Sequence, residues 1–145
     1  MYIHPYYVEV PVRFSDTDAY GIVHHSNFYC WLEESRFLFF DKLMKESIDC
    51  LMQVQYKFPV IESHCKYIKS ISYPEKVSIE MIITIKKSAK IHFEYVVFNS
   101  KNEKCAKAFT EHVYMINERV LLNHPEEFKK IVLRYNDERK YFVLE

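Results

Sequence analysis

The chain is organised around residues 12–28, which read VRFSDTDAYGIVHHSNF. This stretch leaves an alternating apolar segment, crosses a polar turn and enters an amphipathic helical pattern. It contains Gly21, the only glycine among the 145 residues. A lone glycine indicates a backbone position that needs positive φ or the close approach of another group. Because two carboxylates, Asp16 and Asp18, lie beside this glycine and just before a helix, the stretch is the first candidate for a functional site.

The flanking pattern predicts an α+β protein. Residues 6–14 alternate between apolar and polar side chains as a strand does, with Val8, Val10, Val12 and Phe14 on one face. Apolar residues then recur at helical spacing from Phe28 to about Met44, which predicts a long helix with Ser26 or Asn27 as its N-cap. The remaining pattern predicts a short helix within 46–58, strands at 59–67, 76–86, 90–98 and 105–116 joined in hairpin succession, and a helix that starts at 124–127. Strands that follow one helix favour an antiparallel sheet curled around that helix. Residues 1–145 are expected to form a single domain.

Composition excludes several classes of protein. Hydrophobic residues make up 49% of the chain and the formal net charge is zero, which argues against disorder and against nucleic-acid binding. No apolar run approaches the roughly 18 residues of a membrane span, and the first residues lack the pattern of a signal peptide, so we expect a cytoplasmic protein with no membrane span. The four cysteines, at positions 30, 50, 65 and 105, have no metal-ligand spacing and are interpreted as buried thiols.

Asp18 is the strongest candidate for chemistry. It precedes a glycine turn and a helix N-terminus, where backbone N–H groups can hold a developing oxyanion beside a working carboxylate. The alternative is an aspartate that only stabilises the turn, the role assigned to Asp16. A metal site on the two aspartates is disfavoured, because no further carboxylate or histidine has ligand spacing, and neither a metal nor a cofactor is expected.

The histidines divide by position. His25 lies at the presumed helix start, where its backbone N–H is a good oxyanion donor, while His24 is a packing or interface residue. His64 either lines the same pocket or is a satisfied core histidine. His92 and His112 are expected to face solvent or a neighbouring subunit. Lysines 66, 69, 86, 87 and 90 gather at strand ends, where they form a solvated rim or contact the phosphates of a nucleotide-bearing substrate.

The groups available for chemistry are a carboxylate and the backbone N–H donors at the start of a helix. The sequence has no P-loop and no glycine pattern for a dinucleotide, and it lacks the chain order of a nucleophilic serine triad. A carboxylate without a strong acid partner suits a substrate with a good leaving group. Thioesters qualify, since a thiol with a pKa of roughly 8.5 leaves as the thiolate with little protonation.

At these residues the sequence resembles a known family. Residues 14–28, followed by Trp31, Glu33 and Arg36, are similar to the hotdog-fold acyl-CoA thioesterases of the 4-hydroxybenzoyl-CoA thioesterase and YbgC-like group. The resemblance implies a five-stranded antiparallel sheet wrapped around one long central helix. It also implies a homodimer or homotetramer with active sites at the dimer interface.

The resemblance also implies roles for individual residues. It places the catalytic carboxylate on Asp18 and the backbone N–H that polarises the thioester carbonyl on His25. The candidates for substrate binding are Tyr20, Gly21, His24, Asn27, His64 and Lys66. Two positions depart from the family pattern, because Phe14 replaces a tyrosine and Tyr20 replaces a small residue.

The expected activity is hydrolysis of an acyl-CoA, or of an acyl-carrier-protein thioester, with Asp18 as general base or as nucleophile. Two alternatives stay open. One is a module that binds acyl thioesters without turning them over. The other is a hotdog dehydratase or hydratase, which would need a second acid–base residue.

Overall fold

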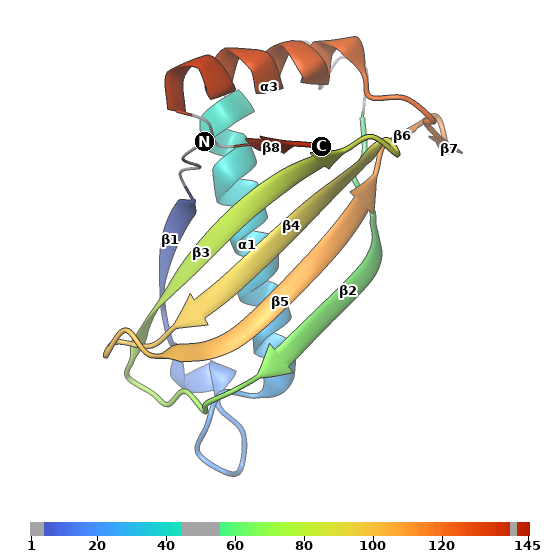
Figure 1. The fold of residues 1–145 in the computed structure, drawn as a ribbon. Helices are drawn as coiled ribbons and strands as arrows, with labels where there is room; N and C mark the ends of the chain where they lie inside the picture. The colour runs from blue at the N-terminus through green and yellow to red at the C-terminus, as the bar shows by residue number, and fades with distance from the viewer. Residues whose placement is uncertain (1–4, 45–55, 140–141) are drawn as a thin grey trace.

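The computed structural model describes residues 5–44, 56–139 and 142–145. Figure 1 shows a curved sheet with one helix lying along its concave face. The elements in chain order are β1 (Tyr6–Pro11), the 3-10 turn η1 (Phe14–Asp16), α1 (His25–Met44), β2 (Val60–Tyr67), β3 (Lys76–Lys86), β4 (Lys90–Phe98), β5 (Lys104–Val113), β6 (Met115–Ile116), β7 (Arg119–Val120), α3 (Glu126–Arg139) and β8 (Phe142–Leu144).

The main sheet has the strand order β1-β3-β4-β5-β2, and all four of these pairings are antiparallel. This confirms the predicted α+β class with five antiparallel strands against one helix. The short strand β8 adds a parallel pairing to β3 at Ile83–Ile85, beyond the part of β3 that pairs with β1.

The predicted hairpin succession is only partly correct. Strands β3, β4 and β5 are joined by hairpins, but β2 pairs with β5 at the opposite edge from β1 and makes no hairpin with β3. The segment after β2 is held against β5, because the Cys105 carbonyl accepts the N–H groups of Ile68 and Lys69. The chain then crosses the end of the sheet to reach β3 (Figure 1). Seven of the eight β2 residues are exposed, as an edge strand allows.

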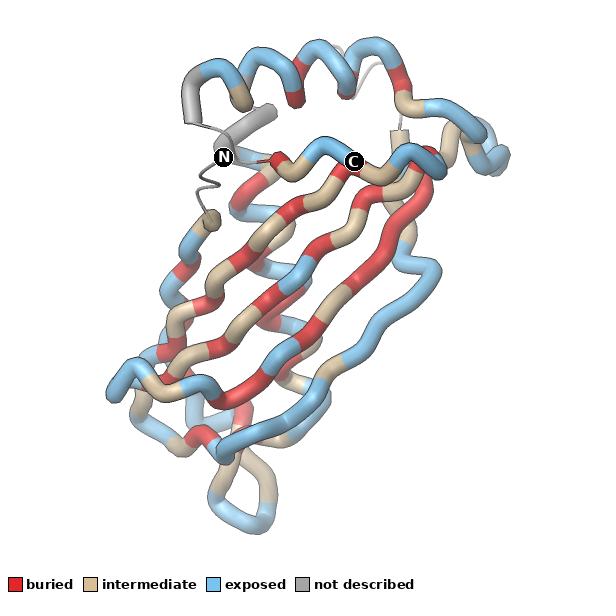
Figure 2. The backbone as a smooth tube through the Cα atoms, viewed as in Figure 1, coloured by how far each residue is buried: buried red, intermediate tan, exposed pale blue. Residues whose placement is uncertain are grey.

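The core lies between the sheet and α1. Alternate residues of β3 and β4 are buried, which Figure 2 shows as regular colour changes along these two strands, whereas β5 has consecutive buried residues from Thr110 to Val113. Leu32 and Phe39 of α1 are buried against these strands, and Ser35 is fully buried with its hydroxyl donating to the Trp31 carbonyl at 2.7 Å. A small residue there lets helix and sheet approach closely. Each fully buried large apolar side chain contributes roughly 1.5–3 kcal/mol.

The C-terminal elements cover one end of this core (Figure 1). Helix α3 follows Pro125, as predicted, and it buries Phe128 and Val132. The tail then returns as β8, where Phe142 packs edge-on against Phe39 of α1 at a centroid distance of 5.8 Å. The Asn136 side chain binds both the N–H and the carbonyl of Phe142, which fixes this return.

Several sequence predictions are wrong in detail. Phe14 is 75% exposed, because β1 ends at Pro11 and η1 takes over before the alternation reaches it. The predicted last strand ends at Val113 and is followed by the small β6–β7 hairpin. His112 is buried, contrary to the predicted solvent or subunit face, since even-numbered residues at this end of β5 face α1.

The described cysteines differ in burial. Cys105 is buried as predicted, Cys65 is half-buried and Cys30 is exposed, and Cys50 lies outside the described residues. The predicted short helix within 46–58 also lies largely outside them. In the ranges that the structure describes, every helix is too short or too polar to cross a membrane.

Candidate active site

Asp16 anchors the loop that leads into α1. It is only 2% exposed, and its carboxylate accepts the Arg13 backbone N–H at 2.8 Å. Its carbonyl accepts the His24 N–H at 2.8 Å and the Asn27 side-chain amide at 2.7 Å. Asp16 therefore has the structural role that the sequence predicted, and Asn27 fastens the first turn of α1 to it.

The loop above this anchor closes on itself. Thr17 and Val23 form an antiparallel bridge, and inside it the Asp18 N–H donates to the Ile22 carbonyl at 2.9 Å. The Gly21 N–H donates back to the Asp18 carbonyl at 3.0 Å. Gly21 has φ of +77° and open space where a Cβ would lie, so the backbone conformation, and not crowding, requires glycine.

Asp18 lies at a cavity of about 380 Å³ beside this loop. It is half-buried, and its Oδ1 accepts the Tyr20 backbone N–H at 2.8 Å, which fixes the carboxylate in an Asx turn. The cavity also receives His25 and Phe28 from α1. Its lining consists of Asp18, Tyr20, Ile22, Val23, His25, Phe28, Tyr67, Ile68, Lys69 and Ser70.

The helix begins earlier than predicted. Its first residue is His25, so Ser26 and Asn27 lie in the first turn instead of forming the cap. His24 caps the helix through its imidazole, whose Nδ1 accepts the Ser26 N–H at 3.2 Å and lies 2.7 Å from the Ser26 hydroxyl. Histidine is not among the residue types that N-caps prefer, so the sequence pattern does not predict this cap.

The backbone N–H of His25 is free for a ligand. Among the residues that the structure describes, none accepts a hydrogen bond from it. It belongs to the N-terminus of a 20-residue helix, where the helix dipole favours negative charge. The cavity is therefore lined by Asp18, whose carboxylate is fixed, and by His25, whose backbone N–H is unpaired among the described residues.

Tyr67 is a site residue that the sequence did not single out. Its hydroxyl donates to the His25 carbonyl at 2.9 Å, and its ring packs edge-on against Phe28 at 5.0 Å. Burial raises the pKa of Tyr67, so the hydroxyl stays a donor. The alternation along β2 is the sequence pattern that could have identified Tyr67. It places Tyr67 on the same inner face of the sheet as Cys65, so that Tyr67 points toward the start of α1.

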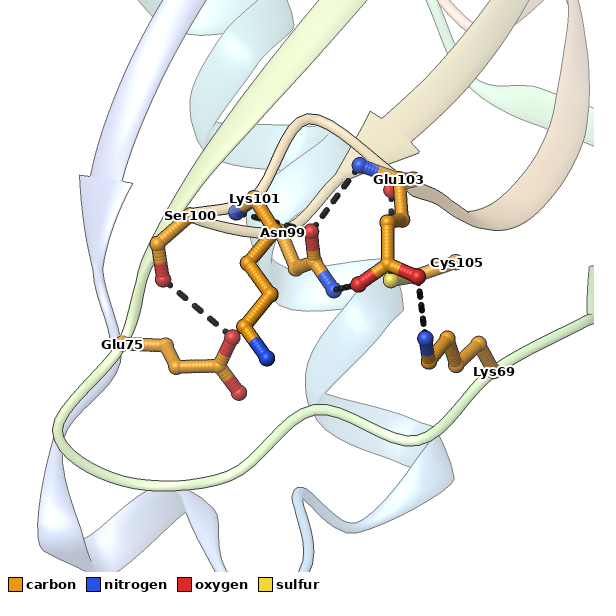
Figure 3. Close-up of polar contacts among 7 residues, drawn as sticks. All are labelled: Lys69, Glu75, Asn99, Ser100, Lys101, Glu103 and Cys105. Atoms are coloured by element: carbon orange, nitrogen blue, oxygen red, sulfur yellow. Dashed lines mark hydrogen bonds and ion pairs between the residues drawn. The ribbon is translucent and has the colours of Figure 1, made fainter.

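A cation also lines the cavity. The Lys69 ammonium is paired with Glu103, and this contact raises the pKa of Lys69 and lowers that of Glu103. Figure 3 shows how the loop between β4 and β5 holds the carboxylate: Asn99 donates to Glu103 through its amide nitrogen at 3.1 Å and accepts the Glu103 N–H at 2.9 Å. Lys69 is therefore held in place at the rim of the cavity.

Two of the candidate residues lie elsewhere in the same chain. His64 and Lys66 alternate with Cys65 and Tyr67 along β2 and so face the outer side of the sheet. His64 stacks on Phe109 at 5.6 Å in a separate groove that also contains Lys66. The structure thus brings together Asp18, Tyr20 and His25, with Gly21, His24 and Asn27 shaping the backbone around them. Within the described ranges, no group of three or more His, Cys, Asp or Glu side chains is placed to hold a metal ion.

Comparisons with known proteins agree with this architecture. The chain is 27% identical over 130 residues to the Bacillus subtilis protein named "Putative acyl-CoA thioesterase YneP", covering 84% of this chain and 86% of that protein. The solved DHNA-CoA thioesterase from Staphylococcus aureus superposes with a TM-score of 0.75 at 24% identity, over 96% of this chain and 98% of that chain. The Staphylococcus aureus protein SAV2348, solved in complex with CoA, gives a TM-score of 0.81 at 13% identity, over 96% of this chain and 88% of that chain.

The two structural matches establish a shared fold. The sequence profile of the Thioesterase-like superfamily matches residues 12–132, from the end of β1 into α3. The protein is therefore a hotdog-fold member of the Thioesterase-like superfamily.

Proposed function

We propose that this protein hydrolyses an acyl-CoA thioester, or the thioester of an acyl carrier protein, to the free acid and the thiol. The observation that carries the proposal is one cavity that holds both Asp18 and the unpaired backbone N–H of His25. Membership of the superfamily supports the reaction class, as does the likeness to a protein named as an acyl-CoA thioesterase.

The two groups suit the two halves of the reaction. The Asp18 oxygen that does not accept from Tyr20 can remove a proton from water, or can attack the thioester carbonyl itself. In either case the carbonyl oxygen gains negative charge in the tetrahedral intermediate, and the His25 N–H is the donor proposed to stabilise it. Collapse of the intermediate breaks the carbon–sulfur bond and releases a thiolate. If Asp18 is the nucleophile, collapse leaves a mixed anhydride on its carboxylate, which water then hydrolyses to the free acid and the regenerated carboxylate. No step requires a metal or an organic cofactor.

The remaining groups of the cavity suit the rest of such a substrate. Tyr20 is 89% exposed at the end of the loop, where it would narrow the entrance. Lys69 is the lining residue best placed by charge to contact a phosphate of the carrier, with Glu103 holding its ammonium until substrate binds.

We also propose that the working form is a homodimer or homotetramer in the cytoplasm. β2 pairs on one side only among the described strands, and Val60, Ile61 and Ile68 on and beside it are 45–50% exposed. An open apolar edge favours pairing with a second copy.

The test is release of free thiol from short-chain, long-chain and aromatic acyl-CoAs, with hydration of enoyl-CoA followed in parallel. We expect thiol release from at least one member of the panel and no hydration. Saturable binding without thiol release would favour the binding module, in which Asp18 only stabilises its turn. Hydration in place of thiol release would favour the dehydratase.

A further inference from the structure

The start of α1 is held from two sides. On the side of the preceding loop, the Asn27 amide donates a hydrogen bond to the Asp16 carbonyl at 2.7 Å. On the side of the sheet, the Tyr67 hydroxyl donates to the His25 carbonyl at 2.9 Å. The first turn of α1 is therefore fastened both to the loop before it and to the end of β2.

The contact from β2 involves the ring of Tyr67 as well as its hydroxyl. The ring packs edge-on against Phe28, at a centroid distance of 5.0 Å and an interplanar angle of 84°. It also lies edge-on to the His25 ring, at 6.2 Å and 83°. Both of these partners belong to the first turns of α1, so the Tyr67 side chain is oriented by the same part of the helix that its hydroxyl binds.

Tyr67 binds the residue whose backbone N–H is proposed as the oxyanion donor. The N–H and the carbonyl of His25 flank one Cα atom in the first residue of a 20-residue helix, so they move together. In an α-helix this carbonyl also accepts the N–H four residues later, and a carbonyl oxygen has two lone pairs for two donors. Any shift of the helix start away from Tyr67 would therefore carry the His25 N–H with it.

The Tyr67 proton is committed to this contact. Burial raises the pKa of Tyr67, and a hydrogen-bonding contact with the Cys65 thiol raises it further, so the hydroxyl stays protonated in neutral solution. A carbonyl oxygen can only accept, so the proton lies toward His25. The hydroxyl is thus a fixed donor to the helix and is not the group that would protonate a leaving thiolate.

We propose that Tyr67 is a positioning residue, whose hydroxyl holds the start of α1 so that the His25 N–H is correctly placed relative to Asp18. The proposal rests on the thioester hydrolysis proposed above and assigns Tyr67 no bond-making step. An oxyanion donor interacts most strongly with the charge of the tetrahedral intermediate and its transition states. Misplacing that donor should therefore lower kcat and leave KM largely unchanged.

The test variant is Tyr67→Phe, which removes the hydroxyl and keeps the ring that packs on Phe28. The matched control is Tyr7→Phe, because Tyr7 lies on β1 outside the lining of the Asp18 cavity and its hydroxyl donates to Glu80 at 3.0 Å. Both are compared with the wild type for thiol release from the best acyl-CoA of the panel.

We expect kcat of Tyr67→Phe to fall about tenfold, short of the roughly 10²–10³-fold that follows loss of an oxyanion donor itself. KM should stay within about twofold, and Tyr7→Phe should match the wild type. The ratio of wild-type to variant kcat should be constant from about pH 6 to 9, since a tyrosine hydroxyl titrates above this range.

Backbone amide resonances test the positioning without turnover. The Ser26 N–H shares a peptide unit with the His25 carbonyl, so its resonance should shift in Tyr67→Phe whenever the hydrogen bond is lost. The His25 N–H belongs to the preceding peptide unit. Its resonance should shift as well if the hydroxyl sets the position of the helix start, and Tyr7→Phe should shift neither resonance.

A lower kcat with unchanged KM, together with a shifted His25 resonance and the wild-type oligomeric state, supports the proposal. Unchanged kcat, a kcat ratio that varies with pH, a shift confined to Ser26, or loss of assembly in Tyr67→Phe would each overturn it. A wild type that releases no thiol from any acyl-CoA would overturn the proposed function itself. That result is distinct from a fully active Tyr67→Phe, which would overturn only the role of Tyr67.

Discussion

The neutral, buried His112 predicts a specific loss of stability in mild acid. Its pKa falls from 6.5 to about 4 on folding, chiefly because the ring is buried. The unfolded chain therefore takes up a proton before the folded protein does as the pH falls. The stabilising contribution is fully present above pH 6.5, declines as the pH falls toward 4 and is lost below that.

The magnitude follows from the two pKa values. At about 1.4 kcal/mol per tenfold change in proton affinity, the total loss is about 3 kcal/mol, most of it reached by pH 4.5. Protonation would also turn Nε2 into a donor toward Thr110, so the Thr110 hydroxyl could no longer donate to it. The loss is a large fraction of the stability of an ordinary domain.

The assay is urea unfolding of the wild type and of His112→Gln at pH 7.5, 6.0, 5.0 and 4.5, at one fixed protein concentration. Gln keeps a donor and an acceptor but does not titrate. We expect the wild type to be the more stable protein at pH 7.5, and the difference in unfolding free energy to shrink by about 2–3 kcal/mol by pH 4.5. Contributions of other groups, including Glu111, largely cancel in the difference. A difference that stays constant over this range would refute the account of His112.

Three further predictions concern the loop before α1. Asp16→Asn should lower the unfolding free energy by about 1–3 kcal/mol in urea and affect turnover less, because it weakens a buried backbone anchor; a larger effect on kcat than on stability would contradict this. Gly21→Ala should cost roughly 1–2 kcal/mol in the same assay, since φ is +77° and space is not limiting; an unchanged unfolding midpoint would count against it. His25→Ala should keep turnover within roughly tenfold, because it leaves the main-chain donor in place; a fall beyond about a hundredfold would move the role to the imidazole.

The sequence predicted those parts of the fold that depend on local alternation. The period of two in β3 and β4 places Ile79, Ile83 and Phe93 on the buried face, as observed. The order of the strands could not be predicted from local alternation. The apolar pattern of β2 does not determine which edge of the sheet β2 joins, and in the structure it pairs with β5. The return of the tail as β8 was missed for a related reason: Phe142 is buried through contacts with Phe39 and Phe128, which are distant in the chain.

The candidate site also has one part that local sequence predicts and another part that it does not. Its backbone could be predicted, since a single glycine and two aspartates before a helix are local signals, and Asp18 and His25 do lie at one cavity. Residues brought in from other elements could not be placed, including Tyr67 from β2 and the Lys69–Glu103 pair. His64 and Lys66 look in sequence like neighbours of the same pocket. In the chain they occupy the outer face, because β2 alternates between the two sides of the sheet.

The carboxylate of Asp18 is the group proposed to perform thioester hydrolysis. The direct test is kcat/KM for thiol release by Asp18→Asn on the best acyl-CoA of the panel, with circular dichroism and oligomeric state measured on the same samples. Asp41→Asn is the matched control, because it makes the same chemical change at an exposed position of α1 away from the cavity. We predict a fall of about a hundredfold or more for Asp18→Asn with fold and assembly retained, and no more than a small change for Asp41→Asn. Near wild-type turnover in Asp18→Asn would contradict the account and leave Asp18 as an aspartate that only holds its turn.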